Sequence, residues 1–309
     1  MDMIMEKIYK VAIIGGGFSG LIAADKLSAK FHGDVIILEK NDRVGKKILA
    51  TGNGRGNVTN EVLRAGNYHS VCGADVSFAI SGHDGGDLRS YFRSKGVNTV
   101  VEDGRVYPSC FQASSVLDML RLSVAHGGGA EKTCAKCEKI ERRDGVFRII
   151  TDNGNYAAEN VILACGGKAA KQYGTDGSAY SLAENFGHTV TALYPSLVQI
   201  KTNTEAIRGL KGLKQKVLAS AYDKDIKLAE TAGDILFTEY GVSGNAAFFL
   251  SSYVTDRPAA KLKIEFLPEV SEEALSAFLK EKAALGYIGA DDALTGVINK
   301  QIGRAIIKN

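Results

Sequence analysis

A glycine cluster near the start of the chain carries the first chemical signal. Residues 15–20 read GGGFSG, which fits the pattern G-x-G-x-x-G, and Glu39 follows about 20 residues after Gly17. In this pattern Gly15 allows a tight turn, Gly17 lets the backbone approach a pyrophosphate, and Gly20 lets a helix pack closely on a sheet. Glu39 can accept two hydrogen bonds from a ribose diol and disfavours a 2′-phosphate. The spacing predicts a dinucleotide site that rejects NADP.

The elements that position these residues follow from the hydrophobic pattern. Residues 8–14 and 34–38 are apolar runs typical of buried parallel strands, and residues 18–30 have helical apolar spacing. Together they form one βαβ unit, which predicts an α/β fold with a Rossmann-like domain and a parallel sheet. The first backbone N–H groups of the helix, from Phe18 and Ser19, would face the phosphates. The motif by itself leaves FAD and NAD open.

A polar, glycine-rich loop follows at residues 40–60. Its side-chain donors and acceptors are Thr51, Asn53, Asn57 and Thr59. Its glycines Gly45, Gly52 and Gly54 would let the backbone curl against a flat ring. The basic residues Lys46, Lys47 and Arg55 would supply positive charge for phosphates, a reduced flavin or an acidic substrate. The alternative is that these side chains are simply exposed to solvent and bind no ligand. Such a loop is more elaborate than a plain dehydrogenase requires, and it favours flavin.

This loop resembles the motif "G-[RK]-K-x-x-x-[ST]-G-x-G-R-C-N-x-[ST]-N" of the aminoacetone-oxidase/BaiN-like family of FAD-dependent oxidoreductases. Further family landmarks occur in order, at residues 106–114, 161–167, 194–198 and 237–244. Residues 174–177 look like a shortened form of the family's "G-S-T-G-D-G" turn. The sequence departs from the family pattern at Cys165 for Thr, Gly56 for Cys, Glu239 for His and Asn245 for Pro. The change at Glu239 argues against histidine chemistry at that position.

The resemblance implies FAD as the cofactor and an oxidoreductase acting on a small organic substrate. The expected cofactor-binding residues are Gly15, Gly17, Phe18, Ser19, Gly20, Glu39, Lys40, Gly45, Lys46, Lys47, Thr51, Gly52, Asn53, Gly54, Arg55, Asn57, Cys137, Ala164, Cys165 and Gly166. No proton-transfer residue is assigned. Lys47, Arg55 and Tyr107 are the candidates for electrostatic effects near the flavin.

The whole chain divides into three expected regions. We expect a Rossmann-like domain at 1–193, a β-rich substrate domain at 194–270 and part of a helical subdomain at 271–309. Helices are predicted at 113–125 and 178–185, with strands at 133–142, 145–152 and 161–165. Short strands are expected at 197–201, 214–222 and 262–266. Ser271 should cap a helix, and a last helix should run from Asp291 or Asp292 to the end.

Composition narrows the classes of function. The 309 residues carry a net charge of +3 without a basic block, which argues against a nucleic-acid partner. No run is long and apolar enough to span a bilayer, and no signal sequence is evident. The five cysteines are scattered, which indicates the reducing cytoplasm. Cys134 and Cys137 should lie on opposite faces of a strand as ordinary structural residues, and no metal site is expected.

The electron donor, the oligomeric state and the substrate stay open. The sequence contains one dinucleotide fingerprint, so NAD(P)H would bind transiently on the flavin, or electrons would pass to oxygen. The rival functions are a flavin-dependent RNA-modifying enzyme and a non-catalytic FAD or dinucleotide sensor. In flavoproteins of this architecture the chain returns at its end to the first domain, and no glycine-rich strand–helix pattern follows residue 268. We therefore expect a fragment whose FAD site is open on the flavin side.

Overall fold

The computed structural model describes residues 7–68, 77–81 and 85–308; Cys72 of the five cysteines lies outside these ranges. The chain divides into two compact units, unit 1 (Met1–Val190) and unit 2 (Thr191–Asn309). From the sequence we expected the corresponding boundary near 193 and a further one near 270. In the part of the chain that is described, no helix is both long and apolar enough to cross a membrane.

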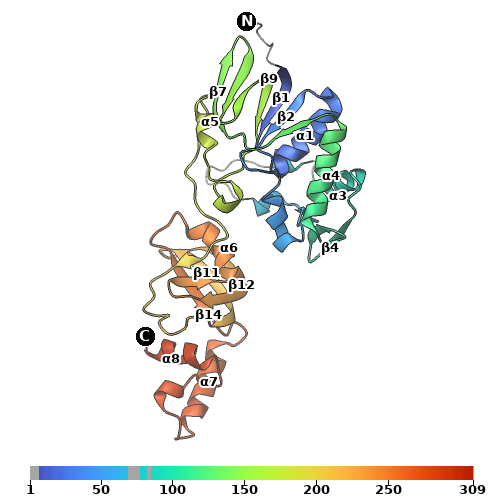
Figure 1. The fold of residues 1–309 in the computed structure, drawn as a ribbon. Helices are drawn as coiled ribbons and strands as arrows, with labels where there is room; N and C mark the ends of the chain where they lie inside the picture. Colours follow the sequence, from blue (N-terminus) through green and yellow to red (C-terminus); the bar gives the residue numbers. More distant parts are fainter. Residues whose placement is uncertain (1–6, 69–76, 82–84, 309) are drawn as a thin grey trace. The chain divides into compact units, whose positions relative to one another are not determined.

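Unit 1 is built on a six-stranded sheet in the order β6-β2-β1-β9-β8-β7 (Figure 1). The strands are β1 (Ile8–Ile14), β2 (Val35–Leu38), β6 (Ala130–Lys132), β7 (Cys137–Arg143), β8 (Val146–Thr151) and β9 (Gly154–Leu163). β6, β2, β1 and β9 are parallel, whereas β7 and β8 add an antiparallel hairpin beside β9. The predicted parallel Rossmann-type core is therefore confirmed, with antiparallel additions.

The remaining elements of unit 1 surround this sheet. They are α1 (Phe18–Phe31), α2 (Ser77–Ile80), α3 (Gly85–Ser94), α4 (Ala113–His126), α5 (Tyr180–Glu184), the 3₁₀ turns η1 (Ile48–Gly54), η2 (Ala65–Asn67) and η3 (Lys171–Tyr173), and the strands β3 (Thr59–Asn60), β4 (Thr99–Glu102) and β5 (Arg105–Pro108). The last three strands form a small antiparallel sheet in the order β3-β5-β4.

The second half of β1 is buried on both faces of the main sheet, where alternate side chains point to opposite sides. Val11 and Ile13 pack in one apolar core together with residues of α1, α3 and α4. Ala12 and Ile14 pack in a second core with residues of β2, β7 and β8. This double burial explains why β1 and β2 are continuous apolar runs in the sequence.

A buried polar network joins the three helices of the first core. Asp25 of α1 is 2% exposed. It accepts hydrogen bonds from Tyr91 of α3 (2.8 Å), from Lys95 directly after α3 (2.8 Å) and from Ser123 of α4 (2.5 Å). Burial alone would raise the pKa of Asp25, but the three hydrogen bonds outweigh it and lower the pKa. Asp25 is thus held as a carboxylate between the helices that cover the sheet.

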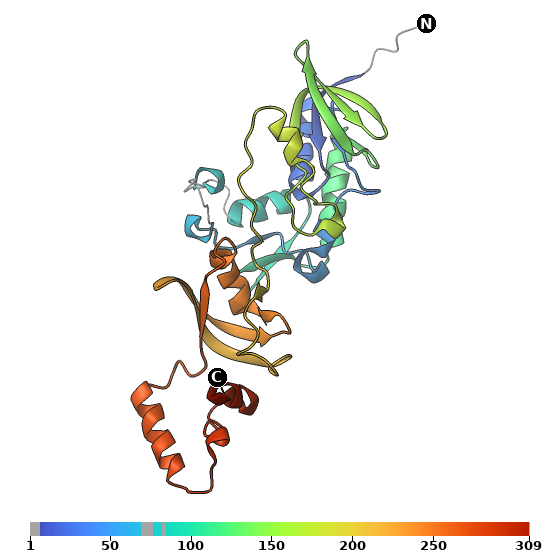
Figure 2. The same cartoon turned by 90° about the vertical axis from the view of Figure 1, so that its left-hand side faces the viewer.

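Unit 2 is built on a five-stranded antiparallel sheet in the order β10-β13-β12-β11-β14 (Figure 2). Its elements are β10 (Ile200–Lys201), β11 (Lys214–Asp223), β12 (Ile226–Phe237), β13 (Gly241–Ser243), α6 (Asn245–Val254), β14 (Lys261–Glu265), α7 (Glu272–Ala283), η4 (Ala290–Asp292) and α8 (Lys300–Lys308). Buried side chains of α6 pack with those of β11 and β12 in one apolar core. The predicted β-rich texture after residue 194 matches this sheet.

Two local predictions need correction. The helix expected from Asp291 or Asp292 to the chain end is instead η4, an irregular link and α8, since Gly296 in the link has φ +82°. Cys134 does not belong to a strand: its φ is +50°, and β7 begins only at Cys137. By contrast, Ser271 caps α7 as predicted, because its side chain accepts a hydrogen bond from the backbone N–H of Ala274.

Candidate cofactor-binding site

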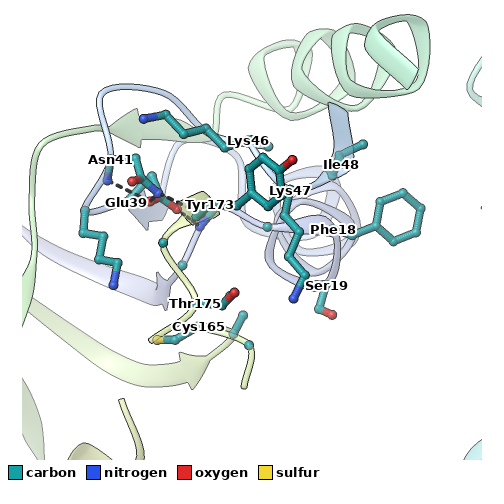
Figure 3. A pocket seen from close by; sticks show the side chains of 18 of the residues that line it. Phe18, Ser19, Glu39, Asn41, Lys46, Lys47, Ile48, Cys165, Tyr173 and Thr175 are labelled. Carbon is teal, nitrogen blue, oxygen red and sulfur yellow. Dashed lines mark hydrogen bonds between the residues drawn. The ribbon is translucent and has the colours of Figure 1, made fainter. Parts of the chain in front are cut away.

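A cavity of about 330 Å³ lies at the carboxyl ends of β1, β2 and β9 in unit 1 (Figure 3). β2 and β9 are the two parallel neighbours of β1, so the chain segments that follow these three strands meet at one edge of the sheet. Ligands of doubly wound folds bind at this edge, and the volume is in the range of small-molecule sites. The cavity is therefore the candidate site.

Most of the residues expected from the sequence line this cavity. They are Gly15, Gly17, Phe18, Ser19, Glu39, Lys40, Gly45, Lys46, Lys47, Thr51, Asn57, Cys137, Ala164, Cys165 and Gly166. Five expected residues are not among those that line it: Gly20, Gly52, Asn53, Gly54 and Arg55. Of these, Gly20 packs against the backbone of Gly15, which does line the cavity.

Glycine is favoured at the three motif positions for different structural reasons. Gly15 has φ +105°, and a Cβ there would lie 2.7 Å from the carbonyl oxygen of Ala164. A Cβ at Gly20 would lie 2.0 Å from the carbonyl oxygen of Gly15. A Cβ at Gly17 would meet no protein atom within 4 Å, although Gly17 lines the cavity and precedes α1. The packing of the protein backbone therefore requires glycine at positions 15 and 20. At Gly17, by contrast, the space that a side chain would enter is open.

The first turn of α1 adds an anion-binding surface to this space. No side chain caps α1 at Gly17, so the first backbone N–H groups of the helix have no side-chain acceptor. Phe18 and Ser19 line the cavity directly after this position. Free N–H groups and the positive end of the helix dipole together favour a phosphate.

Glu39 is buried at the end of β2, with 7% of its surface exposed. Its Oε2 accepts a hydrogen bond from the backbone N–H of Gly16 (2.8 Å). Its Oε1 accepts two from Asn41, one from the backbone N–H (2.8 Å) and one from Nδ2 (2.6 Å). A carboxylate offers about four lone-pair sites, so about one is left for a ligand hydroxyl instead of the two expected from the sequence.

The lysines of the cavity differ in how their charge is used. Lys40 forms an ion pair with Asp176 (3.0 Å) and Lys46 one with Asp42 (2.7 Å). Hydrogen bonds from Ser178, followed by Lys40, hold the pKa of Asp176 well below its usual range. In the described part of the chain Lys47 forms no ion pair, and its Nζ donates to the carbonyl oxygen of Ala169 (3.4 Å). Lys47 therefore brings a positive charge that an anionic ligand can use.

Asn57 supplies an acceptor that the described protein atoms do not satisfy. Its side-chain Oδ1 is buried and has no hydrogen-bond partner, and Asn57 lines the cavity. An unpaired buried acceptor is costly, and a ligand hydroxyl or N–H would remove this cost. This orphan oxygen is a second observation, besides the open space at Gly17, that fits a bound polar cofactor.

Arg55 and Tyr107 were candidates for electrostatic effects near the flavin, and the structure places Arg55 in another contact. Its guanidinium group lies 4.5 Å from the ring centres of both Tyr107 and Phe111 and pairs with Glu102. Tyr107 is buried beneath it, with 5% of its surface exposed. Since the charge of Arg55 is balanced by a carboxylate and lies outside the cavity lining, a structural role accounts for this residue.

The two cysteines that line the cavity are poorly reactive thiols. Burial raises the pKa of Cys137 to about 12, with the nearby Cys165 contributing. Burial and the charge of Glu39 raise the pKa of Cys165 to about 11. Both thiols stay protonated near neutral pH, so they provide neither a thiolate nucleophile nor a redox pair there. For Cys137 this agrees with the expectation that it is not part of a redox pair.

One part of the cavity lining was not expected from the sequence. Asn41 and residues 173–179 line the cavity between the end of β2 and α5. The shortened family turn at 174–177 was the sequence signal for this segment, but its side chains were not assigned to the site. Cys137 was among the expected cofactor-binding residues, and Ala135 and Lys136 line the cavity directly before it.

The chain is similar to several known proteins. Residues 9–305 match the family described as "HI0933-like protein Rossmann domain". The 3-dehydro-bile acid delta(4,6)-reductase of Clostridium scindens is 36% identical over 303 residues, which are 95% of this chain and 73% of that protein. A ribosomal RNA dihydrouridine synthase of Haemophilus influenzae is 26% identical, over 87% of this chain and 67% of that protein. The solved glycine oxidase of Geobacillus kaustophilus is 15% identical with a TM-score of 0.38, covering 89% of this chain and 77% of that one.

Proposed function

Since this chain belongs to the HI0933-like Rossmann family and is an FAD-dependent oxidoreductase, we propose that it reduces a carbon–carbon double bond conjugated with a carbonyl group. The names of two relatives share this chemistry. A 3-dehydro-Δ4,6 bile acid has a ketone conjugated with its double bonds, and dihydrouridine differs from uridine by a saturated bond next to a ring carbonyl. A small organic enone is the substrate class we favour, because the more similar relative acts on a bile acid.

The observation that supports FAD in this cavity is the open space before Gly17 at the start of α1. The pyrophosphate would bind the N–H groups of Phe18 and Ser19, with Lys47 providing the balancing charge. Glu39 would accept one ribose hydroxyl through Oε2. The unpaired Oδ1 of Asn57 would accept a hydroxyl or ring N–H of the flavin half. The residues present therefore fit the cofactor.

Held in this cavity by the start of α1, Glu39 and Lys47, FAD would supply hydride chemistry at the β-carbon of the enone, with NAD(P)H as the reductant and solvent water as the source of the proton at the α-carbon. The role of the protein is to hold the cofactor and to balance its negative charge. Lys47 lies beside the first turn of α1 and is available to stabilise negative charge on the cofactor. The buried walls provided by Ile14, Leu38 and Leu182 exclude water from one side of the cavity.

The proposed reaction is tested with the FAD-loaded protein under nitrogen. We expect NADH or NADPH to bleach the visible flavin absorbance, and a 3-oxo-4-ene steroid to restore it with formation of the saturated ketone. Primary amines should not reduce the oxidised flavin. Reduction of the flavin by an amine, with no reoxidation by the enone, would contradict the proposal. Full reduction by NAD(P)H without turnover of any acceptor would instead indicate a sensor.

A second candidate function is reduction of uridine in RNA, which the name of the Haemophilus influenzae relative favours. The near-balanced charge of the chain speaks against tight binding of a polyanion. The same assay with a uridine-rich RNA as acceptor distinguishes the two. Reoxidation of the flavin by RNA, weakening steeply as salt is raised, would support the RNA function and displace the small enone.

Replacing Glu39 with alanine should weaken FAD binding by about 1–3 kcal/mol, since a charge-assisted hydrogen bond to the ribose is lost. Titration of flavin-free protein with FAD, followed by flavin fluorescence, measures the change. Glu159→Ala is the matched control, because Glu159 is an exposed carboxylate paired with Lys10 outside the cavity. Equal FAD affinity of Glu39→Ala and the parent would mean that this carboxylate serves the protein alone.

A further inference from the structure

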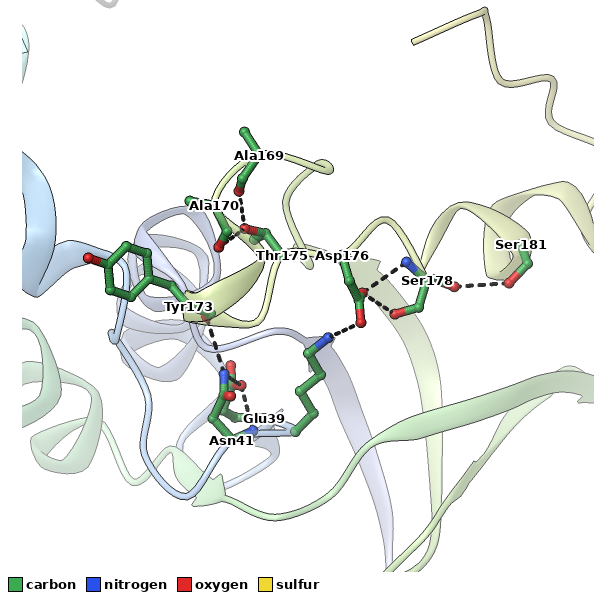
Figure 4. Close-up of polar contacts among 10 residues, drawn as sticks. Glu39, Asn41, Ala169, Ala170, Tyr173, Thr175, Asp176, Ser178 and Ser181 are labelled. Atoms are coloured by element: carbon green, nitrogen blue, oxygen red, sulfur yellow. Dashed lines mark hydrogen bonds and ion pairs between the residues drawn. The ribbon is translucent and has the colours of Figure 1, made fainter. Parts of the chain in front are cut away.

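Two chain segments are joined at one end of the cavity. We call residues 166–179, which follow β9, the strap. Within it, Gly166 and residues 173–179 line the cavity. Figure 4 shows the contacts between the strap and the turn after β2. Lys40 of the turn pairs with Asp176 (3.0 Å), and Asp176 accepts hydrogen bonds from the backbone N–H (3.0 Å) and hydroxyl (2.6 Å) of Ser178. The strap is thereby fastened to the turn beside Glu39.

Asn41 lies at the centre of this junction. Its Nδ2 donates to Oε1 of Glu39 (2.6 Å) and to the carbonyl oxygen of Tyr173 in the strap (3.5 Å). Its carbonyl oxygen accepts from the backbone N–H of Cys134 (2.8 Å). A Cβ at Gly174 would lie 2.6 Å from this same Nδ2, so the strap runs directly against the amide. The side chain of Asn41 thus contacts the carboxylate and the strap, while its backbone carbonyl oxygen contacts the segment before β7.

We propose that Asn41 is a positioning residue for FAD, which holds the carboxylate of Glu39 in its ligand-accepting orientation and ties it to the strap. This inference rests on the proposed placement of FAD in the cavity. With Oε1 occupied by two donors of Asn41, the carboxylate cannot rotate without losing both, so Oε2 stays the oxygen that faces Gly16 and the ligand. Neither the family motif nor the dinucleotide fingerprint includes this residue.

A double-mutant cycle tests whether Asn41 acts through Glu39. FAD is titrated into flavin-free parent, Asn41→Leu, Glu39→Gln and the double variant. We expect each single substitution to raise the Kd for FAD by about tenfold, and the double variant to bind no more weakly than the weaker single one. Independent effects, with fold-changes that multiply in the double variant, would overturn the inference, and so would a Kd within twofold of the parent for Asn41→Leu.

Asn41→Asp keeps the size of the side chain and adds a readout that a general loss of structure would not give. Its carboxylate would face Oε1 of Glu39 at hydrogen-bond distance, and two carboxylates so close repel each other unless they share a proton. At pH 8 their repulsion should displace Glu39, whereas at pH 6 a shared proton should restore the hydrogen bond. We expect the Kd of this variant for FAD to fall about tenfold between pH 8 and pH 6.

The parent protein is the control for this pH profile, and its Kd should change by less than twofold. The titratable and charged groups on the elements packed against position 41 are Glu39, Lys40, Asp42, Arg43, Lys46, Lys132, Cys134, Lys136, Cys137, Cys165, Lys168, Lys171, Tyr173 and Asp176. None of these residue types ordinarily titrates between pH 6 and 8. A flat profile for Asn41→Asp would overturn the inference. Absence of FAD binding by the parent would instead remove the proposed site, so the two failures are distinguishable.

Discussion

Gly17→Val is expected to abolish FAD binding while the flavin-free protein unfolds at the same temperature as the parent. Gly17 has φ −79° and ψ −170°, an extended conformation that valine adopts readily. Its Cβ would meet no protein atom within 4 Å, so the new methyl groups would project into the cavity at the start of α1. They would occupy the space that the pyrophosphate needs to reach the helix N–H groups.

The loss should be at least about 100-fold in Kd, because each hydrogen bond to a charged group is worth about 1.5–3 kcal/mol. Flavin content after purification and titration with FAD measure it. Gly20→Ala is the contrasting control: its Cβ would lie 2.0 Å from the carbonyl oxygen of Gly15, so it should lower the unfolding temperature even without flavin. Equal flavin content in Gly17→Val and the parent would show that the pyrophosphate does not bind there.

Asp25→Ala is expected to cost about 3 kcal/mol in the free energy of unfolding of unit 1, which is near the low end for breaking a buried ion pair. The substitution leaves Lys95, Tyr91 and Ser123 without their common acceptor. The cost stays near the low end because the Lys95 side chain is 21% exposed and regains contact with water. Urea unfolding followed by circular dichroism measures the difference.

Lys10→Ala is the surface control, since Lys10 pairs with Glu159 in an exposed ion pair. This substitution should lower the free energy of unfolding by less than about 1 kcal/mol.

The pKa of Asp25 is lowered in the folded state. The contribution of Asp25 to stability is therefore present above the ordinary aspartate pKa and is lost as the pH falls below about 4. The difference between the parent and Asp25→Asn should therefore shrink in acid. A difference that does not change with pH, or a cost equal to that of Lys10→Ala, would contradict this role.

The nucleotide-binding half of the fold was predictable because its signals are local. Residues 8–14, 18–30 and 34–38 carry their periodicity within a few turns or strands, and they correspond to β1, α1 and β2. The roles of Gly15 and Gly20 follow from close backbone approach, which the G-x-G-x-x-G spacing encodes. The family was also recognisable, since the loop at 46–60 is a specific motif and the family match spans residues 9–305.

Other features depend on which segments meet in space, and a sequence does not display that directly. Arg55 belongs to the same motif as Asn57, yet it packs on the rings of Tyr107 and Phe111 while Asn57 lines the cavity. The link before α8 breaks a helix that local spacing favoured, because Gly296 adopts a left-handed conformation there.

The junction of Asn41 with the strap is the clearest case of such a feature. Tyr173 lies far along the chain from Asn41, and the two are joined only because β2 and β9 are both parallel neighbours of β1. The sequence by itself therefore determined the βαβ unit, the cofactor class and the family. The tertiary structure decided which side chains share the cavity, because parallel strands bring together the ends of segments that are distant in sequence.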